Sequence, residues 1–170
     1  MTISFVEHFA RSEQFDRIFR NGMALVEATA TYLDGQGRRE AKALSPAVAM
    51  VYAAESMRLT TRLLELASWL LVRRSLKTGE IGPDEARVKR RRIKLVSVGR
   101  PAHVKSYDDL PERLRDLIEQ SFALNDRIVQ IDRGLDWGPG PEGPATLSNP
   151  VAAQIADIEA ALGDISQPRH

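Results

Sequence analysis

The sequence predicts an all-α protein built as an antiparallel three-helix bundle with a long second helix. Three long segments repeat apolar residues at helical spacing, and capping residues, prolines or glycines mark their ends. The only β-branched cluster, residues 93–98, is short, and a lone strand there would have nothing to pair with. At 170 residues and 43% apolar content, the chain is long enough for one domain with a real core.

The first predicted helix covers residues 12–33. Its apolar residues return to one face at helical spacing, and Ser12 is placed as the N-cap. Gly22 is its weak point, because glycine lowers helix propensity. Residues 34–39 follow, and their two glycines predict a turn, since they lack the lysine–serine pair of a phosphate-binding loop.

The second predicted helix, residues 46–78, is the longest, at roughly 50 Å for a rise of 1.5 Å per residue. Ser45 and Pro46 open it and Gly79 closes it. Its apolar residues cover more than one face, so it can contact more than one neighbour. A symmetric homodimer would bury such a surplus apolar face. The residues that extend the apolar surface of this helix beyond one face are Val51, Met57, Leu64 and Leu71.

The third predicted helix covers residues 109–136. Asp109 is placed as its N-cap, Pro111 lies in the first turn, and Glu112 falls three residues after the cap. Apolar residues follow in steps of three and four, interrupted by Ser121, so the helix must pack against another. The stripe consists of Leu110, Leu114, Leu117, Leu124, Ile128, Ile131 and Leu135.

The connections define the domain organisation. Between the second and third helices, Asp84 and Glu85 suit the first turn of a short helix. Residues 1–137 form the predicted bundle domain. Residues 138–170 are a Pro/Gly linker and a mobile C-terminal tail. Within this tail a small amphipathic stripe could fold on a partner or on the bundle; it consists of Val151, Ile155, Ile158 and Leu162.

Composition excludes several classes of protein. With 24 basic and 23 acidic residues, the net charge is too small to attract the chain as a whole to nucleic acid or membrane. The longest apolar stretch, residues 66–72, is too short to cross a bilayer, and residues 1–10 lack the pattern of an export signal. We therefore expect a cytoplasmic protein without membrane insertion.

No residues point to catalysis, a cofactor or a metal. Zero cysteines exclude thiolate chemistry, and the three histidines lie in separate segments without ligand spacing. No serine lies in a nucleophile elbow, and the apolar stripes leave few polar groups for a site between helices. We expect a protein that is not an enzyme.

The strongest binding candidate is a basic segment within residues 87–105. Its cations attract phosphates and acidic protein surfaces alike, so solvated linker, acidic protein partner and nucleic acid all remain open. Only Tyr107 lies near enough to stack on a base, and helix-turn-helix spacing is missing. The segment's main cations are Arg87, Lys89, Arg90, Arg91, Arg92 and Lys94.

Several blocks resemble one family. Tyr32-Leu33-Asp34-Gly35, the block from Glu55 to Leu71, and Leu117-Ile118-Glu119-Gln120-Ser121 are similar to the RcdA-like proteins of alphaproteobacteria, also catalogued as DUF1465. The resemblance runs from about residue 15 to residue 136. It implies a dimeric three-helix bundle that acts as an accessory adaptor of the ClpXP protease in cell-cycle control.

By the same resemblance, the partners are the ClpX/ClpP protease, a response-regulator-type adaptor, and a substrate such as the transcription factor CtrA. Within the resembling block, Arg58, Thr61 and Arg62 either line a partner surface or support the bundle. We predict a non-enzymatic scaffold for regulated proteolysis. The alternative is a nucleic-acid-associated regulator that uses the basic residues 87–105 on phosphates.

Overall fold

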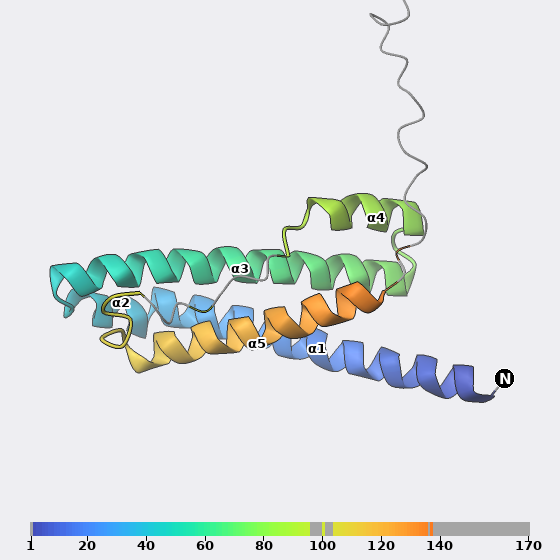
Figure 1. The fold of residues 1–170 in the computed structure, drawn as a ribbon, viewed down its shortest axis with the longest axis horizontal. Coiled ribbons are helices and arrows are strands. Elements are labelled where there is room, and N and C mark those ends of the chain that lie inside the picture. Colours follow the sequence, from blue (N-terminus) through green and yellow to red (C-terminus); the bar gives the residue numbers. More distant parts are fainter. Residues whose placement is uncertain (1, 96–99, 101–103, 136, 138–170) are drawn as a thin grey trace, which may run out of the picture. The chain divides into compact units, whose positions relative to one another are not determined.

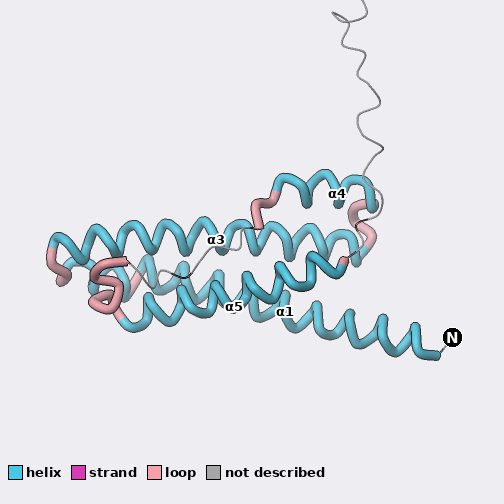
Figure 2. The backbone as a smooth tube through the Cα atoms, viewed as in Figure 1, coloured by secondary structure: helices cyan, strands magenta, loops and turns pink. Residues whose placement is uncertain are grey.

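The computed structural model describes residues 2–95, 100, 104–135 and 137, with side chains from residue 11 onward. The described residues form five helices and no strand, which confirms the predicted all-α class (Figures 1 and 2). The helices are α1 (Thr2–Asp34), α2 (Gln36–Lys42), α3 (Pro46–Thr78), α4 (Pro83–Arg92) and α5 (Glu112–Gly134).

The three long helices α1, α3 and α5 pack together, but their directions differ from the predicted antiparallel order. Helix α1 is antiparallel to the other two, whereas α3 and α5 run in the same direction (Figure 1). Two contacts show this, because Arg62 bonds to Ser121 and Trp69, further along α3, bonds to Asp132 further along α5. The connection from residue 79 to residue 111 therefore returns the chain to the end of the bundle where α3 begins.

Helix α1 begins ten residues earlier than predicted, at Thr2. The predicted N-cap at Ser12 is wrong, because the helix passes through it. Neither glycine nor proline occurs between Thr2 and Ser12, so nothing in that stretch breaks the helix. Gly22 is buried where α1 crosses α3, and a Cβ there would lie 2.5 Å from Leu70 Cδ1. The weak point in helix propensity is thus a position of close helix packing.

The predicted turn at residues 34–39 is shortened to Gly35, because α2 begins at Gln36. Gly37 is buried inside α2, and a Cβ there would lie 2.6 Å from Tyr52 Oη and 2.9 Å from the Tyr32 carbonyl oxygen. Tyr32 Oη donates a hydrogen bond of 2.7 Å to Glu40 Oε2. Burial, with Glu40 adding to it, raises the pKa of Tyr32. Because Gly37 has no side chain, α2 can pack closely against Tyr32 and Tyr52.

The bounds of α3 match the prediction. Ser45 Oγ accepts a hydrogen bond of 3.4 Å from the Val48 amide, and Pro46 occupies the first turn. Gly79 closes the helix with φ of 76°, a left-handed conformation that favours glycine. The inward side of α3 forms the centre of the core with buried Leu59, Leu63, Leu66, Trp69 and Leu70.

Helix α5 begins at Glu112, three residues later than predicted, and ends at Gly134 rather than 136. The predicted cap is wrong: the N-cap position is Pro111, and no side chain caps this end. Asp109 lies instead in a turn, where its amide donates to the Ser106 carbonyl oxygen. The predicted stripe packs inward, with Leu110, Leu114, Leu117 and Ile128 buried.

The short helix suggested by Asp84 and Glu85 is present as α4, which packs against α3 through buried Ala86. The chain divides into two units, Met1–Asp136 and Trp137–His170. The predicted linker and tail, residues 138–170, lie outside the described residues. Within the described part, no helix is both long and apolar enough to span a membrane.

Candidate functional site

Arg62 supports the bundle from within. Its Nη1 donates a hydrogen bond of 2.7 Å to Ser121 Oγ, and its guanidinium carbon lies 3.7 Å from the centre of the Phe122 ring. Ser121 in turn donates to the Ile118 carbonyl oxygen at 2.6 Å. The hydroxyl of this buried polar residue, which interrupts the apolar stripe of α5, therefore has hydrogen-bond partners. Burial lowers the pKa of Arg62, with Glu55 and other acidic groups opposing the shift. This side chain joins α3 to α5.

Arg58 and Thr61 differ from Arg62 in exposure. The Glu55 carboxylate is buried at 2% exposure and pairs with Arg58, whose own side chain is 60% exposed. Thr61 is exposed on α3. The structure therefore pairs Arg58 with Glu55, whose charge also acts on Arg62, and leaves Thr61 exposed.

The basic segment is helical up to Arg92, the last residue of α4, and is partly tied to the bundle. Arg90 Nε donates to Asp132 Oδ1 at 2.6 Å and Arg90 Nη2 donates to Asp132 Oδ2, a two-point arrangement that fits a carboxylate closely. Trp69 Nε1 donates to the same Oδ1 at 2.8 Å. Asp132 thereby links α3, α4 and α5, and its hydrogen bonds raise the pKa of Arg90.

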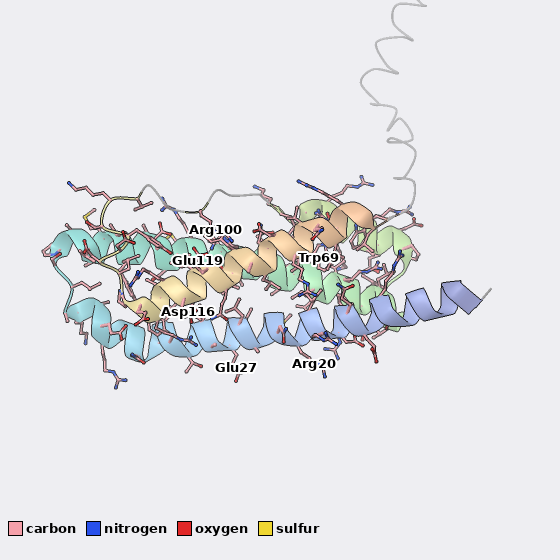
Figure 3. All side chains as sticks on the ribbon, turned by 60° about the horizontal axis from the view of Figure 1, so that its bottom comes forward. Arg20, Glu27, Trp69, Arg100, Asp116 and Glu119 are labelled. Carbon is pink, nitrogen blue, oxygen red and sulfur yellow. The ribbon has the colours of Figure 1, made fainter. Side chains whose placement is uncertain are left out.

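Other cations of this segment also meet the chain's own acids. Arg87 pairs with Asp84, whereas the contact of Lys94 with Glu65 Oε2, at 2.9 Å, is made by the Lys94 backbone amide and does not involve its ammonium group. Figure 3 shows Arg100 beside Glu119 of α5, and their charged atoms are 3.3 Å apart. These contacts leave less free positive charge than the sequence indicates.

Within α4, the exposed part of the basic segment is a smaller patch formed by Lys89, Arg91 and Arg92. Lys89 makes a solvent-exposed pair with Glu85 at 3.4 Å. Arg91 and Arg92 are exposed and make no ion pair within the described part of the chain. Lys94, which follows the end of α4, is exposed as well.

The sequence did not indicate the role of Asp132. Glu119 also meets the basic segment, through Arg100, whereas Asp116 pairs with Arg113. One signal was available. Asp132 lies in the last turn of α5, where the helix dipole disfavours a carboxylate, so a nearby cation was to be expected.

The outward side of α3 carries an apolar row that the bundle leaves uncovered. Met50, Met57, Leu64 and Leu71 are 76%, 73%, 64% and 51% exposed. They follow one another in steps of seven, which keeps them on one side of the helix. We call these four residues the outer α3 stripe. Large apolar rows of this kind mark interaction sites more often than ordinary surface.

The described residues contain no group of three or more potential metal-ligating side chains. His103 and His170 lie outside the described residues, and the side chain of His8 is not described. What the described surface offers is therefore binding chemistry: an apolar stripe on α3 and a small cationic patch on α4.

Comparison with known proteins places this architecture in a family. The model of the family described as "Protein of unknown function (DUF1465)" matches residues 6–162. The chain belongs to the DUF1465 family. This match extends beyond both ends of the resemblance seen in residues 15–136, and it includes most of the C-terminal segment.

Among solved structures, RcdA from Caulobacter crescentus is similar to this DUF1465 protein. The two chains are 44% identical, and the match covers 71% of this chain and 88% of RcdA with a TM-score of 0.57. No curated protein matches. The predicted membership of the RcdA-like family is confirmed.

Proposed function

We propose that this DUF1465 protein is a non-enzymatic accessory adaptor in regulated proteolysis. The observation that carries the proposal is the 44% identity with RcdA over 71% of the chain. Its partners would be the ClpX/ClpP protease, a response-regulator-type adaptor and a substrate such as CtrA, and its place would be the cytoplasm where these act. The family resemblance supports each of these assignments.

The mechanism is scaffolding. An adaptor holds a substrate beside the protease, and the raised effective concentration increases degradation without new chemistry. The described surface supplies two binding regions for this: the outer α3 stripe and the patch of Lys89, Arg91 and Arg92 on α4. Of the predicted partner-binding residues, Arg62 and Arg90 act within the bundle, whereas Thr61 and this patch face solvent.

We propose further that the chain is a homodimer joined through the outer α3 stripe. Four large apolar side chains in steps of seven match the spacing of a helix–helix seam. Two copies related by a twofold axis would place the stripe against itself and remove both from water. The polar side chains around the stripe would stay at the rim.

An affinity pull-down from alphaproteobacterial lysate tests the adaptor proposal, with nuclease treatment and two salt concentrations. The full chain is compared with a form ending at Trp137. Recovery of ClpX or a response-regulator adaptor after nuclease treatment is the expected result, and its loss with the shorter form would assign the contact to residues 138–170. Recovery of neither protein would contradict the proposal.

The second candidate is a nucleic-acid-associated regulator, and the exposed charge of Arg91 and Arg92 favours it. Each phosphate contact releases counterions, so such binding weakens steeply as salt rises. In the same pull-down, recovery of nucleic acid alone, released by the higher salt, would replace the adaptor proposal with this one.

A further inference from the structure

A groove lies where α1 passes the last turns of α3 and α5, away from α2. Its volume is about 400 Å³. Side chains from all three helices line it, so its shape depends on the packing of the bundle rather than on a loop. The residues that matter for its chemistry are Arg11, Phe15, Arg73, Lys77, Ile131 and Leu135.

The groove is cationic. Arg11, Arg73 and Lys77 line it, and no carboxylate does among the side chains that the structure describes. Asp16 lies outside the lining and pairs with Lys77 at 2.6 Å, but the Asp16 side chain is 55% exposed. An exposed pair of this kind contributes little, so the carboxylate of a ligand can replace Asp16 at small cost. Burial lowers the pKa of Arg73, whose guanidinium nevertheless carries its positive charge.

The floor of the groove is apolar and held in place by the core. Phe15 packs on Trp69 and Phe19, with ring centres 6.4 Å and 6.2 Å apart. Ile131 and Leu135 complete the floor from the end of α5. An occupant must therefore present an apolar side chain to the floor and carboxylates to the surrounding cations.

We propose that this groove binds an acidic peptide segment of a partner protein, with one apolar side chain seated on the Phe15–Ile131 floor. Its charge selects an acidic ligand, and a space of this size holds one or two side chains of an extended segment rather than a nucleic-acid duplex. The proposal rests on the proposed role in protein interaction. It does not depend on which protease or cargo is involved.

A peptide-display selection tests the groove with purified full-length chain as bait and random dodecapeptides as probe. A selected peptide is then measured against the double variant Arg11→Glu/Lys77→Glu. The matched control is Arg38→Glu/Arg39→Glu, the same charge change at two exposed positions on α2. Circular dichroism checks that both variants keep their helices.

The expected result is enrichment of peptides that combine Asp or Glu with a large apolar residue. Their affinity should fall at least about tenfold with the groove variant and stay unchanged with the control. No enrichment, equal loss with both variants, or displacement by a DNA duplex as effective as free peptide would overturn the proposal. Because neither protease nor lysate is present, failure here leaves the ClpX pull-down result intact, and the converse also holds.

Discussion

The two sides of α3 are both apolar, yet only one is explained by the bundle. On the inward side, Leu59, Leu66 and Trp69 are at most 1% exposed among residues of α1 and α5. On the outward side, Met57 and Leu64 are 73% and 64% exposed. The inward side holds one chain together. The outward side has the composition of a core but no described part of the chain covers it.

The two sides of α3 therefore correspond to two different requirements, which are folding of the single chain and association with a partner. Folding requires only the inward side, since a helix in a three-helix bundle needs one apolar stripe. An outward stripe adds nothing to the monomer and raises the risk of aggregation unless a partner covers it. We therefore assign stability to the inward side of α3, and we propose that association uses the outer α3 stripe.

The largest expected effect is a loss of stability on the inward side of α3 that has no counterpart on its outward side. Leu66→Ala removes fully buried atoms and should lower the free energy of unfolding by about 2–5 kcal/mol at any protein concentration. Leu64→Ala is the matched control on the outward side. Its effect should stay within about 0.5 kcal/mol in dilute solution and grow only where dimers form. Urea unfolding at two protein concentrations measures both, and equal losses would refute the division between the sides.

The basic segment offers the same comparison between an inward and an outward cation. Arg90→Ala leaves Asp132 without its two-point partner and should destabilise the chain by about 2 kcal/mol. Arg91→Ala, on the exposed side of α4, should change stability by less than about 0.5 kcal/mol. Thermal unfolding of the two variants provides the measurement. If Arg91→Ala proved the more damaging, the assignment of Arg90 to the bundle would be wrong.

A smaller effect is expected where glycine permits close packing. Gly37→Ala would place a Cβ 2.9 Å from the fixed Tyr32 carbonyl oxygen and should cost about 1–2 kcal/mol despite alanine's better helix propensity. At Gly82, a Cβ would meet nothing within 4 Å, so Gly82→Ala should be nearly neutral. Differential scanning calorimetry compares the two, and an unchanged melting temperature for Gly37→Ala would argue against tight packing of α2.

Sequence periodicity predicted the long helices well because burial imposes a regular pattern. The bounds of α3 follow from Ser45, Pro46 and Gly79, whose capping chemistry is local and specific. The start of α1 was missed because Ser12 suits a cap but is tolerated inside a helix. At α5, Asp109 has the right chemistry for a cap, but the chain turns before the helix begins.

Contacts between distant segments were harder to predict. The parallel direction of α3 and α5 depends on where the connection from residue 79 to residue 111 leads, which local patterns do not determine. For the same reason, the charge of the basic segment was overestimated: Arg90 meets Asp132, a residue 42 positions away. Arg91 and Arg92 are exposed on α4, while their role in binding a partner stays a prediction.

Sedimentation equilibrium of the full chain beside Leu64→Glu tests whether the outer α3 stripe joins two copies. A carboxylate in the outer α3 stripe would be buried without a partner in the proposed dimer, but would remain in water in the monomer. We expect a dimer of about twice the 18.9 kDa chain mass for the original protein, and a folded monomer for Leu64→Glu. A dimer that survives Leu64→Glu, or an original chain that is monomeric at micromolar concentration, would contradict this proposal.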